Sequence, residues 1–204
     1  MTIQDFKDQF QHHRPTLQGA RHEFAVLVPL VEKEDGLYLL YEVRAAKMRR
    51  QPGEVCFPGG RMEPGETPVQ CALRETWEEL GIPESAIEVL GEPDFLYLRT
   101  VALMRPVLAR VDAAALEHLQ LCEGEVDTVF LVPLSYLCDN PPTFYHYKLQ
   151  PIIENFPYDE VQVPPDYPWA PGRMEVPVYH GLPHPLWGLT ARITWWLTET
   201  MRQS

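Results

Sequence analysis

The segment Gly60–Ile82, GRMEPGETPVQCALRETWEELGI, constrains the fold of this chain more than any other feature. It follows a Pro-Gly-Gly sequence, whose glycines free the backbone to leave a strand along an unusual path. Thr67 followed by Pro68 is a typical helix start, because proline at the first helical position gives up no hydrogen bond. Gly81 then provides the C-terminal stop. The segment therefore predicts a strand, a loop and a helix over residues 67–80.

Three glutamates of the predicted helix, Glu75, Glu78 and Glu79, lie three and four residues apart, so they share one face. Like charges at this spacing destabilise a helix by about 0.2–0.5 kcal/mol per pair unless they are compensated. A bound divalent cation reverses the sign of that cost, and carboxylate oxygens on a rigid helix suit Mg²⁺. A glutamate-rich helix is more often only a solvated surface, so these three residues alone do not establish a metal site.

The longer string resembles the signature of the Nudix hydrolase family. That signature is Gly, five residues, Glu, seven residues, Arg-Glu, an apolar residue, any residue, Glu-Glu, any residue, Gly and an apolar residue. Thr76 occupies the first apolar position, and every other fixed position matches. The resemblance implies an α/β fold, the Nudix α/β/α sandwich with a mixed β-sheet, and hydrolysis of a diphosphate bond.

The same resemblance implies roles for individual residues. The expected metal ligands, for Mg²⁺ or Mn²⁺, are Glu75, Glu78, Glu79 and the carbonyl of Gly59. Arg74 would orient the glutamates by charge-assisted hydrogen bonds, and Glu66 would stabilise the loop before the helix or hold a more distant metal. The metal would polarise the diphosphate and activate the attacking water, so that Glu78 and Glu79 also count as catalytic residues.

A second acidic candidate lies later in the chain. In many Nudix enzymes a glutamate from a later loop acts as the general base or as an extra metal ligand. Glu123 and Glu125 precede a strand predicted at residues 128–132. Glu125 aligns better with the Glu-Val that comes before the Phe-x-Val-Pro-Leu block of the family, and an exposed loop acid is the alternative interpretation.

Four cations lie within seven residues, just upstream of the predicted metal segment. They are Arg44, Lys47, Arg49 and Arg50. A solvated basic loop is one interpretation, but the position of these residues in an otherwise acidic chain favours anion binding. A substrate that carries a phosphate in addition to its diphosphate would benefit from such a patch.

Residues 40–60 also resemble the signature of the coenzyme A diphosphatases, a subgroup of the Nudix family. The matching positions are Leu40, Arg44, Ala45, Arg49, Gly53, Phe57, Pro58, Gly59 and Gly60. Tyr41 and Glu42 replace a leucine and a threonine, and Glu54 stands where glutamine is common. We expect these departures to leave the metal site undisturbed. Residues 126–137 and 184–193 resemble later blocks of the same subgroup.

The subgroup resemblance implies hydrolysis of coenzyme A or acyl-coenzyme A to 3′,5′-ADP and 4′-phosphopantetheine or its acyl derivative. Another nucleoside diphosphate derivative, such as ADP-ribose or NADH, is the alternative substrate. A non-catalytic domain that senses a nucleotide or coenzyme A is a different class of function. Such a domain would commonly lack a ligand glutamate, whereas Glu75, Glu78 and Glu79 are all present.

Charge and composition limit the partners of the chain. The net charge of −12 argues against general binding to nucleic acids or anionic membranes, because both would repel this surface. The four cysteines form no CxxC pair, which argues against zinc and against a disulfide framework. The polar start resembles no signal peptide, and no stretch is long enough to span a bilayer. We therefore expect a cytoplasmic protein that binds a small nucleotide substrate.

We expect residues 1–204 to form a single domain with two additions. Residues 1–20 are polar and predict a short helix or an arm. Residues 140–186 predict an ordered, proline-rich insertion, since eleven of the twenty-one prolines lie between Pro141 and Pro185. This composition favours loops with short strands over long regular elements.

The remaining pattern predicts an alternation of strands and helices. Strands are expected at 24–31, 37–43, 86–90, 94–98, 103–111 and 128–132, and helices at 113–121, 134–138 and 188–201. Trp77, Trp195 and Trp196 are assigned to the core or to a subunit interface, so a homodimer is compatible with the sequence.

Overall fold

The computed structural model describes residues 1–13, 17–19, 22–98 and 102–203, and its central feature is a mixed β-sheet. Within these residues the strand order is β3-β2-β1-β7-β5. In addition, β4 pairs with β1, β6 with β7 and β8 with β2. Only β1 and β7 pair in parallel among the described strands. The strands are β1 His22–Lys33, β2 Gly36–Arg44, β3 Val55–Cys56, β4 Gly59–Arg61, β5 Ile87–Gly91, β6 Leu96–Leu98, β7 Ala102–Val111 and β8 Val126–Pro133.

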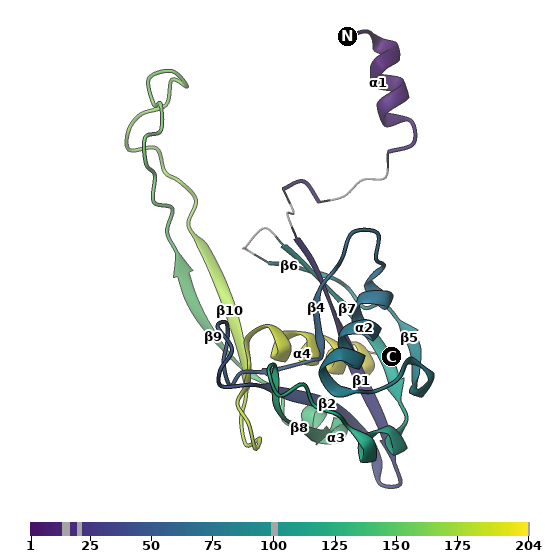
Figure 1. The fold of residues 1–204 in the computed structure, drawn as a ribbon. Coiled ribbons are helices and arrows are strands. Elements are labelled where there is room, and N and C mark those ends of the chain that lie inside the picture. Colours follow the sequence, from purple (N-terminus) through teal and green to yellow (C-terminus); the bar gives the residue numbers. More distant parts are fainter. Residues whose placement is uncertain (14–16, 20–21, 99–101, 204) are drawn as a thin grey trace.

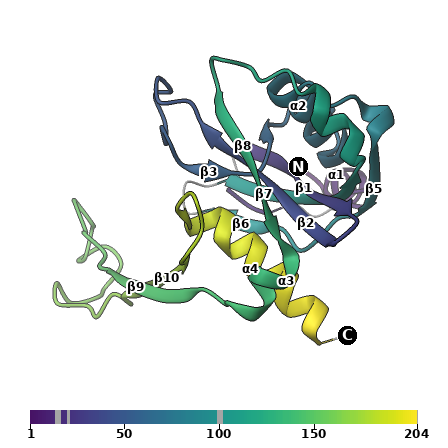
Figure 2. The ribbon, with the colours of Figure 1, turned by 90° about the horizontal axis from the view of Figure 1, so that it is seen from below.

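Helices cover both faces of this sheet. Successive side chains of a strand point to opposite faces, so the apolar strand β1 can serve two cores. Val26 and Val28 belong to the core beneath α4 (Gly188–Arg202), and Ala25 and Leu27 belong to the core beneath α2 (Pro68–Leu80). Figure 2 shows these two helices on opposite sides of the sheet. The predicted α/β fold, with a mixed sheet between helices, is confirmed.

One predicted helix is shorter than expected. Residues 113–121 form only a 3-10 helix at Ala113–His118, after which the chain turns back toward α2. The Gln120 N–H donates to the Leu80 carbonyl at 2.9 Å, and the Cys122 N–H donates to the Glu79 carbonyl at 2.9 Å. These bonds tie the segment to the end of α2, and a continued helix could not form them. Two further short helices are the 3-10 helix Glu84–Ala86 and α3 Leu134–Asp139.

The proline-rich region contains a second sheet, where the sequence predicted loops with short strands. It consists of β9 Thr143–Leu149, β10 Gly172–Tyr179 and β11 Leu186–Trp187. Strands β9 and β10 pair from Thr143 to Leu149 and form an arm that leaves the body of the protein (Figure 1). Pro177 is tolerated in β10 because β11 pairs only with Val178 and Tyr179, which leaves one side of Pro177 outside the ladder.

The N-terminal helix α1, Ile3–Phe10, lies apart from the sheet (Figure 1). Its Thr2 side chain accepts a hydrogen bond from the Asp5 N–H at 3.2 Å, and all its residues are exposed. A short helix at this position agrees with the sequence. Among the residues that the structure describes, no helix is both long enough and apolar enough to cross a membrane.

The close approach of β4 to β1 depends on Gly59. This residue pairs with Val26 and has a φ of 153°, which side-chain-bearing residues rarely adopt. A Cβ atom on Gly59 would meet the backbone carbonyl of Ala25 and would lie 2.6 Å from the Val26 Cα. Gly59 therefore allows the backbone path that brings β4 under α2.

We predict that Gly59→Ala lowers the free energy of unfolding by about 2–5 kcal/mol, because it adds both backbone strain and a clash with backbone atoms. Gly91→Ala is the matched control, since a Cβ there meets no atom within 4 Å. Denaturant unfolding of both variants measures the difference. Equal stability of Gly59→Ala and the wild type would contradict the packing described for β4.

Candidate metal centre

Helix α2 begins and ends as its sequence predicts. The Thr67 hydroxyl accepts a hydrogen bond from the Gln70 N–H at 3.2 Å, and the Gln70 side chain accepts one from the Thr67 N–H at 2.9 Å. Gly81 ends the helix with a left-handed φ of 71°. Thr76 is fully buried, and its hydroxyl donates to the Ala72 carbonyl at 2.7 Å. This bond satisfies the hydroxyl, so Thr76 fits at an otherwise apolar position of the signature.

The three signature glutamates of α2 differ in exposure. Glu79 is only 3% exposed, and its carboxylate accepts a hydrogen bond from the Gly59 N–H at 2.8 Å. The Glu75 side chain is 15% exposed and the Glu78 side chain is 56% exposed. Exposure to solvent thus increases from Glu79, which lies between α2 and β4, through Glu75 to Glu78. The helical spacing alone did not predict this gradient of burial.

Arg74 contacts the carboxylates on both sides of the loop–helix junction. Its Nε donates to Glu66 at 2.9 Å, while its Nη1 donates to Glu75 at 2.8 Å and to Glu78 at 3.1 Å. The hydrogen bond from Arg74 holds the pKa of Glu66 below its usual value. The guanidinium therefore fixes three carboxylates relative to one another, and Glu66 anchors it from the loop.

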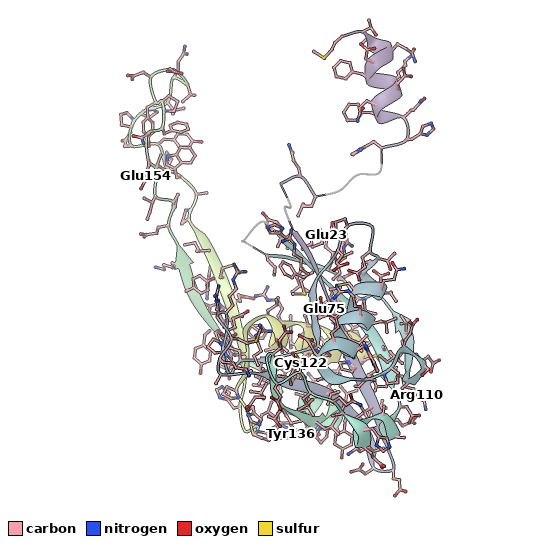
Figure 3. All side chains as sticks on the ribbon, in the orientation of Figure 1. Glu23, Glu75, Arg110, Cys122, Tyr136 and Glu154 are labelled. Carbon is pink, nitrogen blue, oxygen red and sulfur yellow. The ribbon has the colours of Figure 1, made fainter. Side chains whose placement is uncertain are left out.

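The carboxylate of Glu75 packs directly against the backbone of Gly60. A Cβ atom on Gly60 would lie 2.6 Å from one oxygen of Glu75. Only a residue without a side chain leaves room for the carboxylate at this point. Figure 3 shows Glu75 on the side of α2 that faces β4, whereas Glu154 lies at the far end of the arm. The arm tip is thus remote from the carboxylates of its own chain.

Glu42, one of the departures from the subgroup signature, belongs to the same group of charges. It is 1% exposed in the middle of β2. Burial raises the pKa of Glu42 to about 7, and the charges of Glu125 and Glu75 add to the effect. Burial also raises the pKa of Glu79 to about 9, with Glu42 as the next cause. Glu42 and Glu79 therefore act on each other electrostatically, and the effect of Glu42 on a bound metal stays a prediction.

The loop before β8 brings Glu125 to this group. The Ala45 N–H, just beyond the end of β2, donates to the Glu125 carbonyl at 2.8 Å. From this position the Glu125 charge raises the pKa values of Glu42, Glu75 and Glu79. Glu125 itself is exposed, so its carboxylate has access to solvent. Among the described residues, Glu123 is not one of the charges that act on Glu42, Glu75 or Glu79.

The four cations predicted to bind substrate fall into two groups. Arg44 ends β2, and its charge lowers the pKa of the neighbouring Glu42. Its buried Nε has no hydrogen-bond partner among the described residues. Lys47, Arg49 and Arg50 are exposed in the loop between β2 and β3, and none forms an ion pair with a described residue. These three side chains are free to meet an anion.

The donor groups of this centre suit a hard divalent cation. Carboxylate oxygens predominate, the Gly60 backbone leaves space for Glu75, and one buried oxygen of Glu42 has no partner among the described residues. In the described conformation no three acidic, histidine or cysteine side chains converge on one point. Arg74 instead holds Glu75 and Glu78, and the Gly59 N–H holds Glu79. Ion binding therefore requires these side chains to exchange partners.

The chain is similar to known proteins in sequence and in fold. The NUDIX domain family matches residues 21–156. The mitochondrial coenzyme A diphosphatase NUDT8 of Mus musculus is 37% identical over 172 residues, which cover 83% of this chain and 73% of that protein. The peroxisomal coenzyme A diphosphatase NUDT7 of Mus musculus is 38% identical over 129 residues, which cover 63% of this chain and 53% of that protein.

The chain is also similar to a nematode protein in sequence and to a bacterial protein in fold. Nudix hydrolase 3 of Caenorhabditis elegans is 34% identical over 146 residues, covering 65% of this chain and 61% of that protein. The chain thus spans less than two thirds of the length of this relative and of NUDT7. A MutT/nudix family protein from Enterococcus faecalis superposes with a TM-score of 0.52 at 16% identity, covering 100% of this chain and 69% of that one. This likeness concerns the fold alone.

We predict that the metal-free protein loses stability as the pH rises. The folded state holds the Glu79 proton more tightly than the unfolded chain, since the pKa is about 9 against an ordinary 4.5. The stabilisation is complete below pH 4.5 and is lost as the pH rises through 9. Glu79→Gln should flatten this decline, and Glu117→Gln, an exposed control, should not. Thermal unfolding at several pH values in a chelator measures the slopes, and identical slopes in all three proteins would contradict the prediction.

Proposed function

The chain belongs to the Nudix hydrolase family, and on this premise we propose that it hydrolyses the diphosphate bond of coenzyme A or acyl-coenzyme A. The products would be 3′,5′-ADP and 4′-phosphopantetheine or its acyl derivative. The group of carboxylates that Arg74, Gly59 and Gly60 hold together carries the proposal, because it can bind the cation that such hydrolysis needs. The names of the NUDT7 and NUDT8 relatives support coenzyme A as the substrate.

Nudix hydrolases use a divalent cation, and Mg²⁺ or Mn²⁺ would polarise the diphosphate and lower the pKa of the attacking water. The proposed ligands are Glu75, Glu78, Glu79 and the Gly59 carbonyl. Arg74 positions Glu75 and Glu78, and Glu66 in turn positions the guanidinium. Metal binding would require Glu75 and Glu78 to exchange their bonds to Arg74 for bonds to the cation.

Glu125 is our candidate for the general base. Its backbone is fixed to the end of β2 through Ala45, while its side chain stays exposed beside the buried carboxylates. This placement lets the Glu125 carboxylate accept the proton of an attacking water. The alternative role, an extra metal ligand, differs in one respect: loss of the carboxylate would then weaken metal binding as well as turnover.

The basic loop would recognise the phosphate that coenzyme A carries in addition to its diphosphate. Lys47, Arg49 and Arg50 are exposed and unpaired among the described residues, and Arg44 lies at the root of the loop beside Glu42. Guanidinium groups suit phosphate because they donate two parallel hydrogen bonds. ADP-ribose and NADH, the alternative substrates, lack the 3′-phosphate and would gain less from this loop.

Two expectations from the sequence stay proposals. A homodimer is supported by Trp77, which is 55% exposed instead of belonging to the core, and by Tyr145 and Tyr147, which are about half exposed on β9. Light scattering of the purified protein measures the oligomeric state. A cytoplasmic location also stays a proposal, since two relatives are named as mitochondrial and peroxisomal, and microscopy of the tagged protein in its host decides it.

We predict that the wild type with Mg²⁺ or Mn²⁺ releases 3′,5′-ADP from coenzyme A faster than it cleaves ADP-ribose or NADH. Glu78→Gln should lower turnover by about 100-fold or more and weaken Mn²⁺ binding, because a proposed ligand is lost. Glu125→Gln should lower turnover but spare Mn²⁺ binding, and the exposed control Glu117→Gln should change neither. Mass spectrometry of the products together with Mn²⁺ titration distinguishes these cases. Faster cleavage of ADP-ribose or NADH would refute the choice of coenzyme A.

We predict that the double change Arg49→Ala with Arg50→Ala raises the KM for coenzyme A by about tenfold, since about 1.4 kcal/mol of phosphate binding is lost. The KM for dephospho-coenzyme A should change little, because that substrate lacks the 3′-phosphate. Arg202→Ala, an exposed change at the end of α4, is the control. An equal rise in KM for both substrates would show that the loop contacts the diphosphate instead.

A further inference from the structure

Glu42 lies where a strand normally carries an apolar residue. It is opposite Cys56 of β3 and Val129 of β8, so β2 is paired on both sides at this point. Leu40, two residues earlier on β2, belongs to the core beneath α2. Because residues two apart on a strand share a face, Glu42 projects from the sheet toward α2. The backbone therefore places this carboxylate on the side of the sheet that carries the signature glutamates.

The partners of the Glu42 carboxylate leave half of it unsatisfied. One oxygen, Oε1, accepts a hydrogen bond from the Cys56 thiol at 3.0 Å. The other, Oε2, is buried and has no hydrogen-bond partner among the described residues. Buried polar atoms in folded proteins nearly always have a partner, so an orphaned carboxylate oxygen indicates a ligand that binds there.

The surroundings of Glu42 indicate that this ligand is a cation. The chain segment from Cys56 to Gly59 contacts both buried carboxylates, because the Cys56 thiol donates to Glu42 at 3.0 Å and the Gly59 N–H donates to Glu79 at 2.8 Å. The charge of Glu42 also acts on Glu79, and the charges of Glu125 and Glu75 act on Glu42. Arg44, two residues further along β2, is the cation whose charge acts on Glu42, but it forms no ion pair with a described residue. A divalent cation bound among these carboxylates would supply the positive charge that protons supply in the metal-free chain.

We propose that Glu42 is an additional carboxylate of the metal centre, whose free Oε2 faces the cation directly or through one bound water. The proposal rests on the metal-dependent function proposed above, but not on the choice of coenzyme A as substrate. It makes this centre richer in negative charge than one with threonine at the same position, as the subgroup signature has. The chain should accordingly bind a divalent cation more tightly than its own Glu42→Thr variant.

The test is Mn²⁺ binding to the full chain without substrate, followed by electron paramagnetic resonance and by calorimetry. Glu42→Gln keeps the shape of the side chain and removes its charge. We expect its affinity for Mn²⁺ to fall by about 10- to 100-fold, or one equivalent of bound Mn²⁺ to be lost. Glu42→Thr should behave in the same way, and Glu42→Asp should retain part of the affinity.

Two controls separate a metal role from a structural one. Cys56→Ser replaces the thiol that bonds Glu42 and keeps the carboxylate, so Mn²⁺ affinity should stay within about threefold of the wild type. Glu117→Gln makes the same change of net charge at an exposed site and should have no effect on Mn²⁺ binding. Far-ultraviolet circular dichroism verifies that each variant is folded. If Glu42→Gln does not fold, the Mn²⁺ affinity of Glu42→Thr is compared with that of the wild type instead.

The outcomes distinguish the two proposals. Unchanged Mn²⁺ affinity in folded Glu42→Gln and Glu42→Thr, with only the melting temperature altered, would overturn the metal role of Glu42 while leaving coenzyme A cleavage intact. Weakened Mn²⁺ binding in a protein that fails to cleave coenzyme A would support the role of Glu42 and refute the substrate. An equally large loss of affinity in Cys56→Ser or Glu117→Gln would also overturn the proposal.

Discussion

The centre depends on how far the positive charge of Arg74 compensates the negative charges of the carboxylates around it. One guanidinium engages Glu66, Glu75 and Glu78, but the structure gives it no bond to Glu79 or Glu42. The two most buried carboxylates therefore depend on protons or on a cation for neutrality. The raised pKa values of Glu79 and Glu42 mean that protons serve this purpose in the metal-free chain. Protons and metal thus compete for the same oxygens, and metal binding should release protons.

The sheet stabilises this concentration of charge because it fixes the backbone of β4, which donates a hydrogen bond to the buried Glu79 carboxylate. Strand β4 lies against β1 only because Gly59 tolerates contact with the Ala25 and Val26 backbone, and the same residue donates its N–H to Glu79. A larger residue would displace that donor, and the buried carboxylate would lose its one hydrogen bond to the backbone. The glycines before α2 therefore serve packing and electrostatics at once.

The parts of this structure that sequence could predict are those with local causes. Thr67 and Pro68 start α2 and Gly81 ends it, so both ends of the helix are set by residues at the ends themselves. The spacing of its glutamates follows from helical geometry alone. The interaction of Glu42 with Glu79 could not be predicted, because it depends on the pairing of β2 with β3 and on the packing of α2, which are contacts between distant residues. The helix predicted at 113–121 is shorter in the structure, and the β9–β10 arm was not predicted, because both also depend on contacts between residues distant in sequence.

Arg44 links the metal centre to substrate recognition. It lies two residues from Glu42 on β2, and its charge acts on that carboxylate in the metal-free chain. If a cation neutralises Glu42, as proposed above, the Arg44 charge becomes available to a substrate phosphate at the root of the basic loop. The same rearrangement would lower the repulsion between the carboxylates and an incoming diphosphate. Metal binding would then strengthen substrate binding before any bond is broken, and by linkage the substrate would strengthen metal binding by the same factor.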